Sequence, residues 1–206
     1  MVSGDKAPNW VCNNEIYNIP GEAGVSSKGG VSNLRILGNY IHDSRTCIQT
    51  DQNRLQDGHF YTAGNWTVQQ NIFERCNVGV HIGRGQDGAP STPEYVINNV
   101  FKDNFHGVLF GFNATPGSRI HNNIFIGGTK SNSCDSYGVC GAGIYFSNNA
   151  AEVRDFNYIL GNLNIKMSNN FFNSVNYSHG VNRICYPSFE NSTLAQFKGR
   201  YATYSL

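Results

Sequence analysis

The stretch Val96-Ile-Asn-Asn99-Val-Phe101 returns as Ile120-His-Asn-Asn123-Ile-Phe125, with the same pattern around its second Asn. Four more segments align on that Asn: Val11-Cys-Asn-Asn14-Glu-Ile16, Ile36-Leu-Gly-Asn39-Tyr-Ile41, Val68-Gln-Gln-Asn71-Ile-Phe73 and Met167-Ser-Asn-Asn170-Phe-Phe172. In every segment the residue three before the anchor Asn is apolar, and the residue two after it is Ile or Phe. The anchors are 25, 32, 28, 24 and 47 residues apart. This self-similarity predicts a solenoid, in which each unit packs on its neighbours.

A third apolar element follows each of the first five anchors. These elements begin with Gly24-Val25, Cys47-Ile48, Gly79-Val80, Gly107-Val108 and Gly143-Ile144. Each unit then contains a strand, an Asn turn, a strand, a turn, a third strand and a long loop. Three short strands per unit, stacked in parallel, predict an all-β fold of the parallel β-helix type with three sheets and about six to seven coils.

The predicted organisation is a single domain over residues 1–206. Residues 1–10 are a lead-in, residues 11–185 form the coils, and residues 186–206 form a cap segment with a short helix near 193–199. Alternation along the third strands predicts which side chains point inward: Val25, Ile48, Val80, Val108 and Ile144. The outward residues are then Ser26, Gln49, His81, Leu109 and Tyr145.

Two interior features follow from the repeat. We expect the anchor Asn to adopt the left-handed backbone conformation of a tight bend and to hydrogen-bond to the Asn above and below it. We expect the aromatic residues two positions later to stack as a ladder: Phe73, Phe101, Phe125 and Phe172.

Composition narrows the function classes. The 206 residues include 28 Asn and 23 Gly, which have poor helix propensity and argue against a helix bundle. The 15 Lys and Arg against 14 Asp and Glu argue against a strongly basic nucleic-acid-binding protein. No apolar run reaches the ~18 residues of a membrane span, and the N-terminus lacks the hydrophobic stretch of a signal peptide. Either the protein is intracellular or the native leader is missing.

The six cysteines include no CxxC pair and no zinc-type spacing. Cys134 and Cys140 flank a short polar loop and could form a disulfide. Cys12, Cys47 and Cys76 are expected to pack as small apolar groups.

The repeat resembles that of the right-handed parallel β-helix proteins of the pectin-lyase-like superfamily, over roughly residues 9–185. The resemblance implies that the third strands form the first sheet, and that a polysaccharide binds along this sheet and its loops. It also implies an extracellular or periplasmic location. Residues 192–206 are similar to a helix-bearing segment of bacterial members, in which a further strand follows, so the chain is expected to be truncated.

If the protein is an enzyme, the resemblance favours a polysaccharide lyase over a glycoside hydrolase. A lyase needs a base and a cation that stabilises developing negative charge, often Ca²⁺ or Arg. His81 is the candidate base, Arg84 its electrophilic partner, and Asp51 or Asp87 a possible Ca²⁺ ligand.

The outward residues Gln49 and Tyr145, with Phe112 and Asp87 in the loops, are candidates for sugar binding. Loops 51–59 and 84–88 would stand together at one edge of the sheet, with the 127–142 insertion at the other. The alternative for this face is a plain solvated surface, where Lys28 pairs with Asp51 and His81 bonds to Gln49.

Two neighbouring pairs, His42 with Asp43 and Glu74 with Arg75, are interpreted as exposed turn residues with local pairing. The rival function is a noncatalytic glycan-binding or structural module, or a catalytically incomplete fragment of a larger enzyme. An uncapped end would also allow a homo-oligomer to form, because an open parallel edge can recruit another chain.

Overall fold

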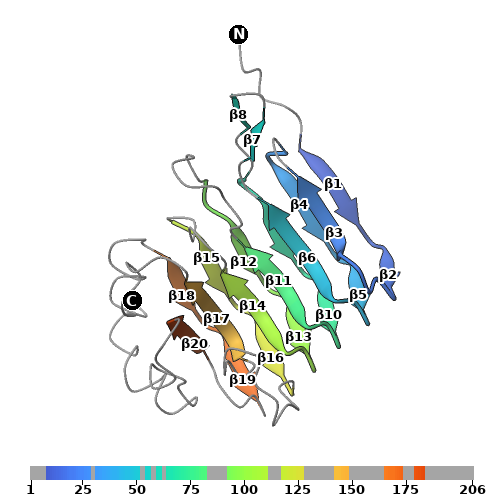
Figure 1. Cartoon of the computed structure of the whole chain (residues 1–206). Helices are drawn as coiled ribbons and strands as arrows, with labels where there is room; N and C mark the ends of the chain where they lie inside the picture. Colours follow the sequence, from blue (N-terminus) through green and yellow to red (C-terminus); the bar gives the residue numbers. More distant parts are fainter. Residues whose placement is uncertain are drawn as a thin grey trace.

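The computed structural model describes residues 8–28, 31–51, 54–56, 59–61, 64–82, 92–110, 117–127, 142–148, 165–173 and 179–183. Its strands form three parallel sheets, here called A, B and C (Figure 1). Sheet A contains β1 (Asn9–Cys12), β4 (Leu34–Leu37), β9 (Thr67–Gln69), β12 (Tyr95–Ile97), β15 (Arg119–His121) and β18 (Lys166–Ser168). Sheet B contains β2 (Glu15–Tyr17), β5 (Tyr40–His42), β10 (Ile72–Glu74), β13 (Val100–Lys102), β16 (Ile124–Ile126) and β19 (Phe171–Asn173). Sheet C contains β3 (Ala23–Lys28), β6 (Thr46–Asp51), β11 (Val78–Ile82), β14 (His106–Phe110), β17 (Ala142–Asn148) and β20 (His179–Arg183).

The chain passes through sheets A, B and C in the same order each time, and each strand pairs in parallel with its equivalents. The fold is therefore a parallel β-solenoid, which confirms the predicted three-sheet all-β architecture. The sequence predicted six to seven coils. In the described part each of the three sheets has six strands. A separate antiparallel pair, β7 (Arg54–Gln56) with β8 (His59–Tyr61), stands in the connection after β6.

The described residues contain no helix, and so none long and apolar enough to cross a membrane. The helix expected near residues 193–199 lies outside the described part.

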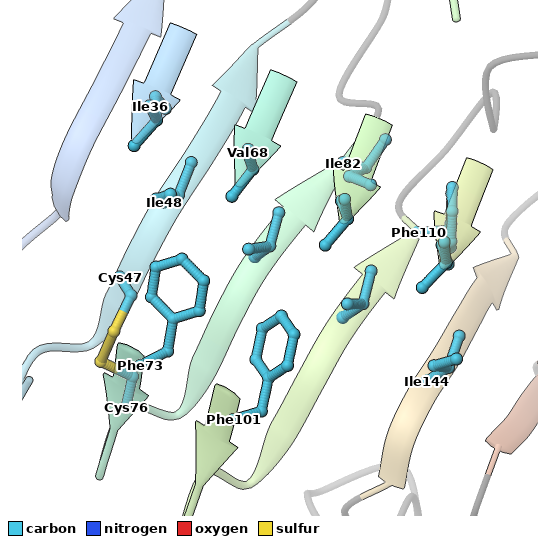
Figure 2. Close-up of a cluster of buried hydrophobic side chains, with 14 of the residues drawn as sticks. Ile36, Cys47, Ile48, Val68, Phe73, Cys76, Ile82, Phe101, Phe110 and Ile144 are labelled. Carbon is cyan, nitrogen blue, oxygen red and sulfur yellow. A yellow bond between two sulfur atoms is a disulfide. The ribbon is translucent and has the colours of Figure 1, made fainter. Parts of the chain in front are cut away.

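Alternation along the strands builds the interior. Ile48 and Ile144 (Figure 2) are fully buried, as predicted, and so are Val80 and Val108. Val25 is partly buried against the same core. Burying one such aliphatic side chain contributes about 1.5–3 kcal/mol.

The predicted aromatic ladder is present in sheet B. Ring centroids lie 5.0 Å apart for Phe73 and Phe101, 4.7 Å for Phe101 and Phe125, and 4.8 Å for Phe125 and Phe172. These separations match the spacing of adjacent strands, so each ring packs on the next one.

Glycine at the start of sheet C strands leaves room for this ladder. A Cβ at Gly79 would lie 2.7 Å from Cδ1 of Phe101, and one at Gly107 would lie 2.5 Å from Cε1 of Phe125. Both distances are too short for real carbon atoms. The recurring Gly before the third strand is therefore a packing requirement.

The anchor Asn residues form the expected ladder at the corner between sheets A and B. The Nδ2 of Asn71 donates to Oδ1 of Asn99 at 3.0 Å, and Nδ2 of Asn99 donates to Oδ1 of Asn123 at 3.0 Å. The same Oδ1 atoms also accept the backbone N–H of the preceding anchor, at 3.0 Å for Asn71 and 2.9 Å for Asn99. Each buried amide therefore satisfies backbone groups of neighbouring strands.

The left-handed conformation belongs to the residue before each anchor, so its predicted assignment to the anchor itself was wrong. The residues with positive φ at this corner are Asn13, Gly38, Gln70, Asn98, Asn122 and Asn169. The position before the anchor makes the bend, while the anchor side chain bonds along the stack. The division explains why Asn recurs at both positions, since it tolerates positive φ.

A second corner, between sheets B and C, follows the same rule. Its left-handed residues are Asn18, Asp43, Arg75, Asp103 and Gly127. The next position also bonds between levels, because Cys76 N–H donates to Oδ1 of Asn104 at 2.8 Å.

Cys47 and Cys76 form a disulfide, with Sγ atoms 2.03 Å apart. Both pack in the core, as expected of small apolar groups, but the bond between them was not predicted. Both side chains are buried, and they belong to successive coils of the solenoid, here called levels. The alignment of the repeats did not show that the two cysteines lie next to each other. Cys12 is free and exposed, so it does not pack in the core either, and Cys134 and Cys140 lie outside the described residues.

Candidate functional site

The outer face of sheet C carries the residues that the sequence singled out for binding. Its register pairs Ser26 with Gln49, Gln49 with His81, His81 with Leu109, and Leu109 with Tyr145. These five positions therefore form one continuous column along the solenoid, as predicted. Sheet C also has the longest strands, five to seven residues against three or four in sheets A and B.

The described side chains of this column are accessible to different extents. Ser26 is exposed, whereas Gln49, His81 and Leu109 are half-buried. The backbone at His81 is held from inside the solenoid, because the buried Thr50 hydroxyl donates to the His81 carbonyl at 3.1 Å. The scaffold thus fixes the strand position of His81.

The remaining predicted site residues are only partly placed. Asp51 ends β6, and its backbone is in register with Lys28. The structure describes the backbone, not the side chains, of Asp51, Lys28 and Tyr145. Arg84, Asp87 and Phe112 lie outside the described residues. The register thus brings His81 beside Gln49, while the pairing of His81 with Arg84 stays a prediction.

Metal binding also stays a prediction. Where side chains are described, no group of three or more His, Cys, Asp or Glu residues could hold a metal ion. The expected Ca²⁺ ligands, Asp51 and Asp87, are not among those side chains.

A polar cluster on the outer face of sheet B was missed by sequence reasoning. Arg75 donates from Nε and Nη2 to the two carboxylate oxygens of Asp43, at 2.7 Å each. Glu74 accepts from the Tyr40 hydroxyl at 2.6 Å and from Lys102 Nζ at 2.9 Å, and it also pairs with Arg75. The predicted local pairing is present, between His42 and Asp43 and between Glu74 and Arg75. His42 and Glu74 end strands and do not begin a turn, and the further contacts join three successive strands.

His42 joins this cluster to the first strand of sheet B. Its Nδ1 lies 2.6 Å from Asp43 Oδ2, and its Nε2 lies 3.3 Å from Glu15 Oε1. The ring stacks on Tyr17 and Tyr40, with centroid separations of 5.2 and 4.3 Å.

The electrostatics of the cluster favour the charged forms of His42, Asp43 and Glu74. The hydrogen bond to Asp43 is the main cause of the raised pKa of His42, and the Tyr40 hydroxyl is the main cause of the lowered pKa of Glu74. Arg75 and then His42 hold the pKa of Asp43 well below its usual range. The carboxylates of Asp43 and Glu74 are stabilised in their charged form, whereas a general acid needs a raised pKa.

The sequence analysis aligned the outward positions of the third strands only. The same alignment of the second strands would have found this cluster. Positions one and three after the anchor Asn point outward and lie in register, which places Tyr40, His42, Glu74 and Lys102 on one face.

Comparison of the chain with protein-family models, with curated proteins and with solved structures gives no match.

Proposed function

We propose that this β-solenoid binds a polysaccharide along the outer face of sheet C. The observation that supports this is the continuous column of Ser26, Gln49, His81 and Leu109 on the sheet with the longest strands. A linear glycan lying along the stack would meet one equivalent position every ~4.8 Å. The connections after β6 and β11 leave from the same edge of this face, where binding loops usually stand.

The finer proposal is a polysaccharide lyase of the pectin-lyase-like type. His81 would remove the proton beside a uronate carboxylate, and the released electron pair would form a carbon–carbon double bond as the adjacent glycosidic C–O bond breaks. A proton then goes to the departing sugar oxygen. Arg84 would stabilise the developing negative charge, and Asp51 and Asp87 would hold Ca²⁺ if the reaction uses it.

A noncatalytic glycan-binding module is the second candidate. Leu109 interrupts the polar column between His81 and Tyr145, which supports binding without chemistry at that level. An extracellular or periplasmic location is part of both proposals. The disulfide between Cys47 and Cys76 supports it, because disulfides persist in oxidising compartments.

Absorbance near the unsaturated-uronate band tests the lyase proposal on polygalacturonate and alginate. We expect His81→Ala and Asp51→Ala to abolish the absorbance rise, while Phe171→Ala, an exposed change on sheet B, leaves it unchanged. Unchanged turnover in His81→Ala would contradict the assignment of His81 as the base. Binding without any cleavage by the unmodified protein would support the module instead.

Self-association through the first strands also stays a proposal. Within the described part, β1, β2 and β3 are the outermost strands of their sheets. Sedimentation velocity over a range of concentrations tests this, and a monomer at every concentration would contradict it.

A further inference from the structure

A second outward column runs along sheet A, away from the proposed glycan face. The register links six positions in sequence: Trp10, Arg35, Thr67, Tyr95, Arg119 and Lys166. Their strand neighbours Ile36, Val68, Val96 and Ile120 are at most 1% exposed in the core. Because side chains alternate along a strand, the column lies on the outer face of sheet A.

The described outward positions of sheet A include three cations and no carboxylate. The column holds Arg35, Arg119 and Lys166, and the parallel outward column of sheet A consists of Cys12, Leu37, Gln69, Ile97, His121 and Ser168. Neither column contains Asp or Glu. The ion pairs among the described side chains instead gather on sheet B, around Asp43 and Glu74.

The local field agrees with this composition. The pKa of His121 is lowered, first by burial and then by the positive charges of Arg119 and Lys166. Arg119 and Lys166 are both exposed and occupy neighbouring strands in register. Two adjacent cations attract a ligand anion more strongly than a cation paired with a carboxylate would.

The shape of the column indicates a linear ligand. Five strand spacings of ~4.8 Å separate Trp10 from Lys166, so the column is roughly 24 Å long. Trp10 is 58% exposed and Tyr95 is half-buried, which gives the column two aromatic side chains among its cations. Aromatic rings offer flat apolar faces on which sugar rings can pack.

We propose that the outer face of sheet A binds an acidic polysaccharide, carboxylated or sulfated, at a site separate from sheet C. Arg119, Lys166 and Arg35 bind the anionic groups, and Trp10 and Tyr95 contact the sugar rings. A nucleic acid is the less suitable polyanion, because the net charge is only +1 and the sequence pI is about 7.6. Nucleic-acid binding surfaces usually belong to more basic domains that neutralise many phosphates.

The test measures binding of the full chain to polygalacturonate and heparin, with dextran as the neutral glycan and oligo-dT as the nucleic acid. The test variant is Arg119→Gln with Lys166→Gln. The control is Arg45→Gln with Lys102→Gln, which removes the same charge from exposed residues off sheet A. Circular dichroism confirms that both variants fold.

We expect the test variant to bind at least one acidic glycan roughly tenfold or more weakly, because charge-assisted hydrogen bonds are lost. The control should stay within about twofold, since it leaves the basic column intact. Added salt should weaken wild-type binding, and dextran should not bind through this face. Carboxylate specificity would appear as a loss for polygalacturonate alone, and sulfate specificity as a loss for heparin alone.

Three results would overturn the proposal: full binding by the test variant, equal loss in the control, or oligo-dT binding as tight as that of either glycan. A glycan affinity that falls in His81→Ala with Gln49→Ala, but not in the test variant, would assign binding to sheet C. That outcome would remove the sheet A site and leave the proposed function standing.

Discussion

The disulfide between Cys47 and Cys76 joins the start of β6 to the corner that follows β10 (Figure 2). Cys76 takes the corner position that Asn104 takes in the next level, and its N–H bonds to that Asn. Cys47 stands in register one residue before Ile48, where the following strands have Gly79 and Gly107. At the position where two other levels have Gly, this level therefore has a Cys that forms a covalent link to the next level.

Breaking this link should destabilise the solenoid. The two cysteines are 29 residues apart, and cross-linking a loop of that length contributes roughly 3–4 kcal/mol in the chain-entropy model. We expect Cys47→Ser with Cys76→Ser to lower the free energy of unfolding by about that amount in urea titrations. Cys12→Ser, at the free exposed cysteine, is the control and should change it by less than ~0.5 kcal/mol. Equal stability of wild type and double variant without reductant would contradict the disulfide.

The Asn ladder should be most sensitive at its centre. Asn99→Ala removes the acceptor for Asn71 and the donor to the Val68 carbonyl, which lies 2.9 Å from Nδ2. These backbone groups are buried, so we expect a loss of about 2–5 kcal/mol in unfolding free energy. Asn14→Ala, at the exposed first anchor, should cost less than ~1.5 kcal/mol, because water can replace its bonds. Similar losses at both anchors would show that the ladder does not act through buried hydrogen bonds.

The fold was predictable because every coil of the solenoid places the same kinds of residue at the same positions. Apolar residues at fixed distances from each anchor Asn become core columns, so Val68, Phe73 and Val80 are buried as the repeat requires. The disulfide was not predictable from the same columns. Cys47 and Cys76 occupy different columns, and only the stacking of successive levels brings them together.

The candidate site was less predictable than the fold. Register placed Gln49 beside His81 because both belong to the repeat. Arg84 and Asp87 follow a strand in a connection, where spacing sets no position. The cluster around Glu74 was missed because its hydrogen bonds and ion pairs join residues 28 to 34 positions apart in sequence.

Glycine at the start of β14 should be required for the aromatic ladder. A Cβ at residue 107 would lie 2.5 Å from both Cε1 of Phe125 and the Gly143 carbonyl oxygen. We therefore expect Gly107→Ala to lower the unfolding free energy by about 1–3 kcal/mol, through overpacking. Gly21→Ala is the matched control, because a Cβ at that residue would have nothing within 4 Å. Thermal unfolding of both variants checks this, and a neutral Gly107→Ala would show that the ladder can shift.

The two outward histidines of sheets B and A should give stability opposite dependences on pH. The pKa of His42 is raised, chiefly by Asp43 and then by Glu15, so its protonated form stabilises the folded state. This contribution is fully present below the unfolded pKa of ~6.5 and is lost as pH rises through the folded pKa. The groups around it are Tyr17, Tyr40 and, on the adjacent strand, Glu74.

His121 provides the opposite case. Burial, Arg119 and Lys166 lower its pKa, so its neutral form is favoured in the folded state. The folded state therefore loses stability as the pH falls from the unfolded value of ~6.5 to the lower folded pKa of His121. Urea titrations of His42→Gln and His121→Gln between about pH 5 and pH 8 measure both effects. Relative to wild type, His42→Gln should cost more stability at the acidic end, and His121→Gln should cost less there. The same trend in both variants would contradict the charge environments described for the two faces.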